Sequence, residues 1–270
     1  MLVEYPGVWS RDVLGGSLLQ NDVKTAVREQ LASLPHTRLL FIRRPGRRAA
    51  AGRRVYVVRS GEREGAAWRG EIADYAELAA LDVAAVLADG AGFATPVRHP
   101  LLLVCTHGKR DRCCARYGRP LYDRVREWVN EDWVWQSTHV GGDRFAGNLV
   151  CLPEGLYFGR VGADAWPLLD EYLAGRIWLD RYRGRSCHPF PAQAAERAVR
   201  KATGLTAFGD VTVESLRRAG HDAWLARLVA GETSYEVDVR LHRGELTYLT
   251  CDALTLRHPR RYVAATPRAT

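Results

Sequence analysis

The feature that most constrains the fold is the run PLLLVC at residues 100–105, which is short, apolar and ends in a cysteine. Such runs are typical of buried central strands. A polar loop, THGKRDRCCARYG (106–118), follows, and the apolar residues of 119–130 then recur at helical spacing. VWQST at 134–138 predicts a second strand. The pattern therefore predicts strand, helix and strand in the middle of the chain.

The residues that follow extend this pattern around one sheet. HVGGDRFAGN (139–148) predicts a glycine-rich loop or a short helix, and NLVCLPEGLYFGRV (148–161) predicts a hairpin that turns at 153–155. Residues 163–175 predict an amphipathic helix. A strand–helix–strand half and a strand–strand–helix half describe a thioredoxin-like α/β domain, which we expect over residues 98–183.

An N-terminal α/β lobe is expected over residues 1–97. Asp74 precedes apolar residues at helical spacing, which predicts an N-capped helix over 74–87. The stretch RRPGRRAAAGRR (43–54) lies between two apolar runs, and it predicts an exposed basic loop between strands.

A small α+β module is expected over residues 184–270. RYRGRS (181–186) indicates a basic linker in front of it, and residues 193–203 have a helical pattern. Strands are expected in VTVESLRR, AWLARLVA, SYEVDVRLH and ELTYLT, which glycine-containing turns join. Nothing in this module indicates chemistry, although Cys251 and His242 lie there.

The composition is that of a soluble globular protein, with 47% hydrophobic and 26% charged residues. No run approaches the ~18–20 apolar residues that span a bilayer, and the first residues lack the features of a secretory signal. We therefore expect a cytoplasmic protein. The net charge of +8 comes from arginine spread along the chain. It indicates an arginine-rich solvated surface that can attract an acidic redox partner protein. Nucleic-acid binding is not expected, because aromatic–basic interleaving is missing, and no membrane partner is expected.

Six cysteines carry the functional information, because three of them lie within ten residues. In a cytoplasmic chain they are expected to be reduced, so a cluster indicates metal or redox chemistry. Cys105 ends a strand, while Cys113 and Cys114 end the following loop. His139 opens the loop after the next strand, and Asp143 lies four residues later. Because the C-terminal ends of the first two strands of a thioredoxin-like sheet are neighbours, we expect these loops to meet.

These residue types suit a redox cofactor. Thiolates bind iron or zinc well, and an imidazole in place of a thiolate raises the potential of an iron–sulfur cluster. An imidazole also couples electron transfer to proton transfer near neutral pH. Gly141 and Gly142 would let backbone N–H groups approach inorganic sulfur closely.

The motifs CTHGKRDRCC (105–114) and HVGGDRFAGN (139–148) resemble those of the sucrase/ferredoxin-like family, the thioredoxin-like ferredoxins. VEYPGVWSRD (3–12) and RGRSCHPFPAQAAE (183–196) are similar to its bacterial branch. The resemblance covers most of the chain. It implies a 2Fe-2S cluster held by two cysteines and two histidines.

Carried over to this chain, the resemblance assigns Cys105 and Cys114 as the cysteine ligands and His139 as the first histidine ligand. Asp143 stands where the family has its second histidine, and Cys113 replaces an arginine. The fourth ligand is therefore open. Asp143 has the favourable spacing, Cys113 has the chemistry that iron–sulfur clusters prefer, and the metal itself could differ.

Three functions follow from this cluster. The first is a 2Fe-2S electron carrier, without catalytic activity of its own, that shuttles one electron between a reductase and an acceptor. The second is a thiol–disulfide redox protein in which Cys113 or Cys114 attacks and Cys105 resolves. The third is a structural zinc-binding module.

The other cysteines and His107 are assigned lesser roles. His107 belongs to the family pattern and is expected to order its loop. Cys151 lies in an apolar strand and is expected in the core. Cys187 and Cys251 have no partner pattern, so both are expected to be structural or incidental.

Overall fold

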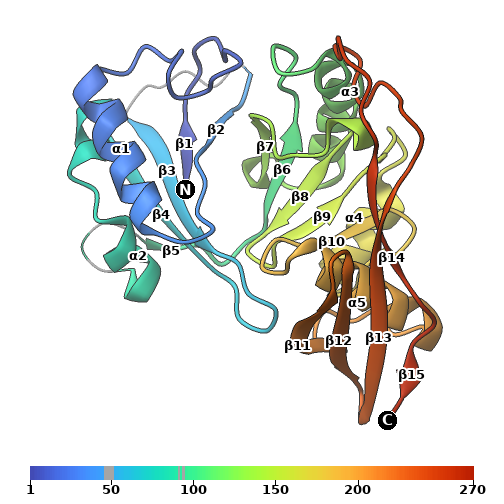
Figure 1. Cartoon of the computed structure of the whole chain (residues 1–270). Helices are drawn as coiled ribbons and strands as arrows, with labels where there is room; N and C mark the ends of the chain where they lie inside the picture. Colours follow the sequence, from blue (N-terminus) through green and yellow to red (C-terminus); the bar gives the residue numbers. More distant parts are fainter. Residues whose placement is uncertain (46–51, 91, 93–94) are drawn as a thin grey trace.

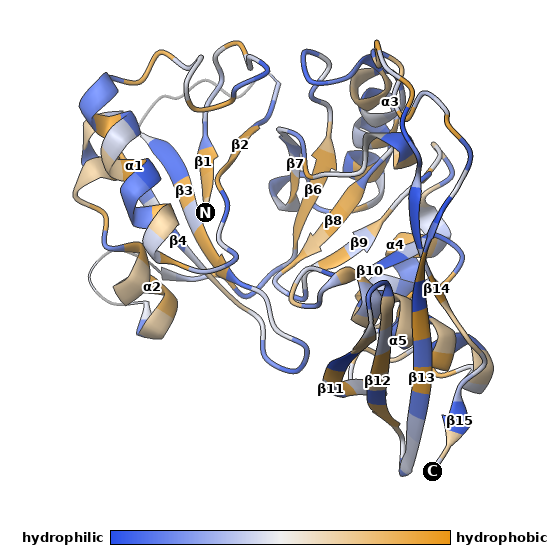
Figure 2. Cartoon of the chain, in the orientation of Figure 1, coloured by the Kyte–Doolittle hydropathy of each residue, from blue (hydrophilic) through white to orange (hydrophobic). Residues whose placement is uncertain are grey.

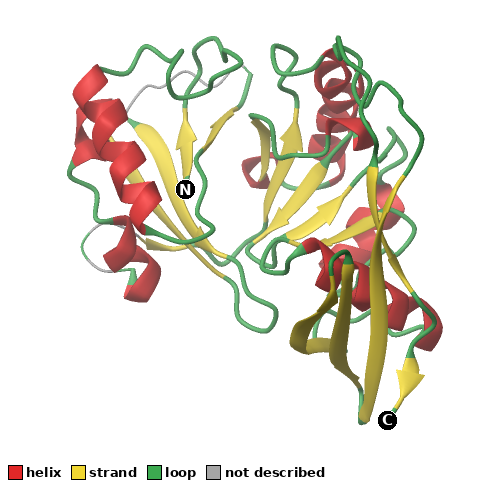
Figure 3. Ribbon diagram, in the orientation of Figure 1, coloured by secondary structure: helices red, strands yellow, loops and turns green. Residues whose placement is uncertain are grey.

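The computed structural model describes residues 1–45, 52–90, 92 and 95–270, and its elements build two β-sheets flanked by helices (Figure 1, Figure 3). The larger sheet has the strand order β10-β9-β8-β6-β7-β2-β1-β3-β4-β5. Its strands are β1 Leu2–Glu4, β2 Leu40–Arg43, β3 Arg53–Arg59, β4 Ala66–Ile72, β5 Thr95–Pro96, β6 Leu101–Cys105, β7 Val134–Ser137, β8 Leu149–Leu152, β9 Leu156–Phe158 and β10 Tyr182–Arg185. No helix of the described residues is long and apolar enough to cross a membrane.

Strands β7-β6-β8-β9 form the thioredoxin-like part of this sheet. β6 and β7 are parallel and are joined by α3 (Arg112–Trp128). β8 and β9 are antiparallel to their neighbours and lead into α4 (Trp166–Leu173). This order of elements confirms the predicted thioredoxin-like α/β fold.

Strand β6 lies at the centre, and all five of its residues are buried. It is strongly apolar, as is its neighbour β8 (Figure 2). Leu102 and Val104 pack in the core beneath α3 and α4, whereas Leu103 and Cys105 belong to a core on the other face. Successive residues of a strand alternate between faces, so a strand that is apolar throughout must be covered on both sides.

The N-terminal lobe continues the same sheet, because β2 pairs with β7 in antiparallel register. Helices α1 (Asn21–Ser33) and α2 (Val83–Asp89) pack with its strands in a separate core. The strands predicted on either side of the basic loop at 43–54 are β2 and β3. Residues 46–51 of that loop lie outside the described part of the chain.

The helix predicted over 74–87 is divided in two. Asp74 caps a short 3-10 helix, η1 (Tyr75–Ala79), and Asp82 begins α2 by accepting the N–H of Ala85. The apolar spacing is continuous through this segment, but a second N-cap acceptor lets the chain change direction and start a new helix.

The basic linker predicted at 181–186 is instead β10, an edge strand of the large sheet. Arg185 is fully buried and pairs with Glu196 of α5 (Phe190–Thr203), at 3.4 Å between Nε and Oε1. Arg200 pairs with the same oxygen at 3.0 Å. Arginine is normally exposed, and it is this buried partner on α5 that makes Arg185 a core residue.

The C-terminal module forms the second sheet, in the order β11-β12-β13-β14 with β15 beside β13, and α5 packs on it. Its strands are β11 Val211–Gly220, β12 Ala223–Ala230, β13 Thr233–Arg243, β14 Arg260–Ala264 and β15 Arg268–Ala269.

The stretch ELTYLT, predicted as a strand, lies in the connection between β13 and β14. Residues 244–259 make up this connection, which we call the strap, and Thr247 forms an isolated bridge with Arg257 in it. Leu246 and Tyr248 are exposed. The alternating pattern there faces no core, so no strand of the sheet forms.

Candidate metal centre

The ends of β6 and β7 lie side by side, because the two strands are parallel and Cys105 is in register with Ser137. Cys105 is the last residue of β6, and His139 lies two residues beyond the end of β7. The N–H of Thr106 donates to the carbonyl oxygen of Ser137 at 3.2 Å, which extends the pairing by one residue. Both loops therefore leave the sheet at one point, as the thioredoxin-like arrangement predicts.

Helix α3 begins earlier than the sequence predicts, so Cys113 and Cys114 lie in its first turn and not in a loop. Asp111 is the N-cap, and its carboxylate accepts the N–H of Cys113 at 2.8 Å. Gly118 lets the helix approach β6, since a Cβ there would collide with the carbonyl oxygen of Cys105. This close approach places Cys114 beside Cys105.

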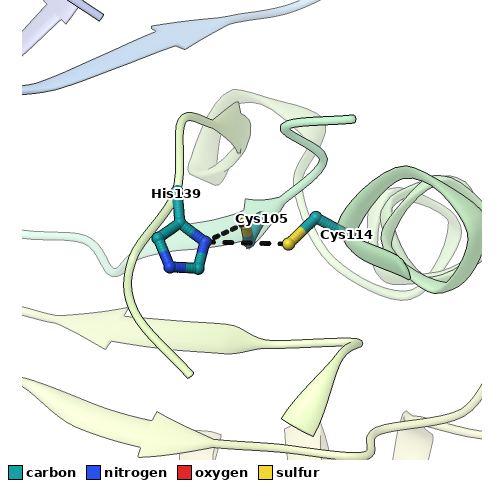
Figure 4. A group of neighbouring side chains, drawn as sticks. All are labelled: Cys105, Cys114 and His139. Carbon is teal, nitrogen blue, oxygen red and sulfur yellow. Dashed lines mark hydrogen bonds between the residues drawn. The ribbon is translucent and has the colours of Figure 1, made fainter. Parts of the chain in front are cut away.

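Cys105, Cys114 and His139 form a compact group of potential ligands that come from a strand, a helix and a loop (Figure 4). The Nδ1 atom of His139 lies 4.0 Å from the Sγ of Cys105 and 3.7 Å from the Sγ of Cys114. All three ligand atoms lie within 4.8 Å of one another, and both thiols are fully buried. One metal ion or one edge of a small cluster could contact all three atoms.

The surroundings of Cys105 favour a thiolate. A hydrogen bond with Cys114 holds the pKa of the Cys105 thiol well below its usual value; burial opposes this shift, and a hydrogen bond with His139 adds to it. For Cys151 on β8, burial raises the pKa of the thiol. Because the thiolate is the form that binds metals, Cys105 is suited to ligation and Cys151 to the core.

His107 lies next to the loop that carries His139. Its Nδ1 atom accepts the backbone N–H of His139 at 3.3 Å, and its ring packs edge-on against Trp9. The side chain is buried, and burial lowers its pKa. A neutral ring can accept this hydrogen bond, so His107 orders the loop in the way the sequence suggests.

A comparison with known families decides the relationship of the chain. The family model described as sucrase/ferredoxin-like matches residues 8–184, which is more than half of the chain. This chain belongs to the sucrase/ferredoxin-like family. The matched residues contain both sequence motifs and all three members of the buried ligand group.

Curated relatives of this sucrase/ferredoxin-like chain occur in yeasts. It is 38% identical over 95 residues to altered inheritance of mitochondria protein 32 of Meyerozyma guilliermondii, covering 31% of this chain and 34% of the relative. It is 30% identical over 102 residues to the protein of the same name from Clavispora lusitaniae, covering 34% of this chain and 37% of the relative. The chain thus spans about a third of the length of the curated relatives it matches.

Among solved structures, the chain is similar to a cysteine-to-serine variant of the thioredoxin-like 2Fe-2S ferredoxin from Aquifex aeolicus. The sequence identity is 14% and the TM-score is 0.29, and the match covers 32% of this chain and 100% of the ferredoxin.

In this family member, Cys113 does not join the other candidate ligands. It forms a disulfide with Cys251 of the strap, with 5.9 Å between the two Cα atoms. Neighbouring residues of a helix point about 100° apart, so Cys114 faces the sheet while Cys113 faces the strap. Cys113 is therefore unavailable as fourth ligand in this structure, and it is not paired with the resolving thiol proposed from the sequence, Cys105.

The disulfide corrects one further expectation, because the prediction that the clustered cysteines are reduced is wrong for Cys113. For Cys251, which is expected to be structural or incidental, the disulfide confirms a structural role. The two cysteines are separated by 138 residues. No sequence motif links them, because they meet only where the strap crosses the beginning of α3.

Asp143 is the first residue of a short 3-10 helix, η3 (Asp143–Phe145), in the loop that starts at His139. Its side chain lies outside what the structure describes. Gly141 and Gly142 precede it with φ angles of +96° and +75°, a left-handed conformation that favours glycine. The two glycines turn the chain sharply between His139 and Asp143.

A cleft of about 1020 Å³ lies next to this loop, and Val140, Gly141 and Gly142 form part of its wall. Its other side is formed by residues of the N-terminal lobe and of the C-terminal module. The basic residues that line it are His36, Arg38, Arg59, Arg183 and His188. No Asp or Glu of the described chain lines the cleft, so the surface beside the candidate metal centre is positively charged.

Proposed function

We propose that this chain is an electron-transfer protein that binds a 2Fe-2S cluster through Cys105, Cys114 and His139. The observation that carries the proposal is the convergence of these three donor atoms at one edge of a thioredoxin-like sheet. Membership of the sucrase/ferredoxin-like family supports it. When bound, such a cluster would accept and release one electron at a time.

The donor set fits this cofactor. Thiolate and imidazole together are ligands of iron–sulfur centres of raised potential, and the low pKa of Cys105 keeps a thiolate available. Burial of both thiols excludes water from the ligand atoms. The hydrogen bond from the backbone of His139 to His107 holds its loop in place.

The test is the metal content of protein purified without oxygen. Iron together with acid-labile sulfide and absorption in the visible range would support the 2Fe-2S assignment. Zinc without sulfide would replace it with the structural zinc module, because two thiolates and an imidazole also suit zinc. Protein without metal would leave thiol chemistry as the function.

We infer that Asp143 supplies the fourth ligand, because it stands at the family's second histidine position and because Cys113 is engaged in a disulfide. The Asp143→Ala variant is expected to lose its cluster faster than wild type, since the cluster would lose its fourth protein ligand. The measurement is the rate of bleaching of visible absorption in the presence of an iron chelator.

Cys113→Ala is the parallel variant for this experiment. It is expected to bleach at the same rate as Cys251→Ser, because both variants remove the disulfide and neither removes a ligand. Faster bleaching of Cys113→Ala than of Cys251→Ser, together with a stable Asp143→Ala, would assign three cysteines and one histidine as the ligands and would contradict the inference.

We further propose that the redox partners of this protein present acidic surfaces to the basic cleft. The probe is ferricyanide, an anionic oxidant. The rate at which it oxidises the reduced protein is expected to fall as ionic strength rises from about 10 to about 200 mM, because salt screens the attraction. With hexaamminecobalt(III), a cationic oxidant, the rate is expected to rise.

Two arginine variants test whether the cleft causes the salt dependence of the oxidation rate. Arg59→Gln, in the cleft, is expected to flatten the salt dependence with ferricyanide. Arg217→Gln, which is exposed on β11 next to the cleft residue Leu216 but on the opposite face, is expected to leave it unchanged. If the oxidation rate depends on ionic strength equally in both variants, the cleft is not the docking surface.

A further inference from the structure

The strap runs from the C-terminal module to the beginning of α3 (Figure 1). Asp252 of the strap accepts the backbone N–H of Arg112 at 2.8 Å, and its own N–H donates to Asp111 at 3.4 Å. Next to these contacts is the disulfide between Cys113 and Cys251. The strap therefore crosses the turn of α3 that also carries Cys114.

The non-covalent contacts of the strap with α3 are exposed to water. The Arg112 side chain, which also pairs with Asp252, is 78% exposed, and exposed ion pairs of this kind add little stability. Four apolar side chains of the strap are 49–94% exposed: Leu246, Tyr248, Leu254 and Leu256. With so little buried surface, the disulfide is the main attachment of the strap to this end of α3.

We propose that the Cys113–Cys251 disulfide is a thiol-exchange site that fastens the strap to the beginning of α3 when oxidised and releases it when reduced. Cys251 is exposed and Cys113 is partly exposed, so a dithiol reductant in solution reaches the bond. The inference goes beyond electron transfer by the proposed cluster. It concerns a second redox centre, one residue away from a candidate ligand.

The exchange reaction balances as follows. A thiolate of the reductant attacks the Sγ of Cys251, the more exposed residue of the pair. The S–S bond breaks, and Cys113 leaves as a thiolate that takes up a proton. The second thiol of the reductant then attacks the mixed disulfide and releases Cys251. Two electrons pass to the protein, which gains two thiols, while the dithiol becomes a disulfide.

Release of the strap changes the surroundings of the candidate metal centre. The beginning of α3 loses its cover, and the backbone N–H of Arg112 loses its acceptor on Asp252. Cys114, which is fully buried in the described structure, lies two residues further along the same turn. The oxidised strap therefore restricts access to this side of the centre, and reduction opens it.

The first measurement is a peptide map of the complete protein, alkylated under acidic conditions and digested with trypsin without reductant. Cleavage after Arg112 and Arg116 yields CCAR, and cleavage after Arg243 and Arg257 yields GELTYLTCDALTLR. A cross-linked pair of these peptides is expected, and dithiothreitol should separate it. Alkylated Cys113 and Cys251 in untreated protein would overturn the proposal.

The second measurement is hydrogen–deuterium exchange of the strap before and after reduction. Amides of residues 244–257 are expected to exchange at least about tenfold faster in the reduced protein, because the disulfide no longer limits local opening of the strap. Cys251→Ser is expected to exchange at the fast rate without reductant. Cys187→Ser, which alters an exposed cysteine that forms no disulfide, should match oxidised wild type. Equal exchange in oxidised and reduced wild type would refute the proposal.

Discussion

Cys105→Ser and Cys114→Ser are each expected to lose nearly all bound iron and sulfide. Both thiols are fully buried, and their Sγ atoms lie 4.0 Å and 3.7 Å from the Nδ1 of His139. A serine hydroxyl is a poor replacement for a thiolate, because it stays protonated near neutral pH and is a harder ligand. Loss of a thiolate ligand from a small cluster is expected to exceed the ~10–100-fold effects that supporting residues alone produce.

Cys151→Ser is the matched control. Cys151 is also fully buried and lies on β8, paired with β6, yet burial raises the pKa of its thiol and it lies outside the ligand group. This variant is expected to keep wild-type iron and sulfide, with some loss of stability from a buried hydroxyl. Iron analysis, sulfide analysis and visible absorption measure all three variants. Wild-type stoichiometry in Cys105→Ser would show that the ligand assignment is wrong.

Glu196→Gln is expected to lower the free energy of unfolding by about 3–5 kcal/mol, the usual cost of removing one partner from a buried ion pair. The Glu196 side chain is 0% exposed and faces two guanidinium groups, those of Arg185 and Arg200, which are also 0% exposed. Tyr182 donates a hydrogen bond to it at 2.9 Å. The amide would leave two buried positive charges without a counter-charge.

The measurement is urea denaturation followed by circular dichroism. Glu127→Gln removes a carboxylate that is 58% exposed and pairs with Arg124 on the surface of α3. It is expected to cost less than about 0.5 kcal/mol. A loss in Glu196→Gln no larger than in this control would mean that the arginines find other counter-charges, and that the network does not hold β10 to α5.

Local patterns predicted the elements that form the site. The apolar residues of β6 can be stable only between two cores, and VWQST has the composition of the adjacent strand. Parallel strands joined by one helix place Cys105 and the loop of His139 at the same sheet edge, so spacing within the chain was sufficient to bring them together. The sequence predicts too late a start for α3, because the polar residues before Arg119 do not show the apolar spacing of a helix, although the helix begins after its N-cap Asp111.

Contacts between distant segments decided what local patterns could not. The segment RYRGRS (181–186) has the composition of a linker. Arg185 within it is nevertheless a core residue, because Glu196 on α5 neutralises its charge in the interior. The partner of Cys113 depends on where a connection 138 residues away crosses the helix. Hydrophobic period and capping residues act over a few neighbouring positions, so the chain reveals them directly. The pairing of buried charges and of cysteines depends on which surfaces meet after folding, and that depends on the packing of the whole chain.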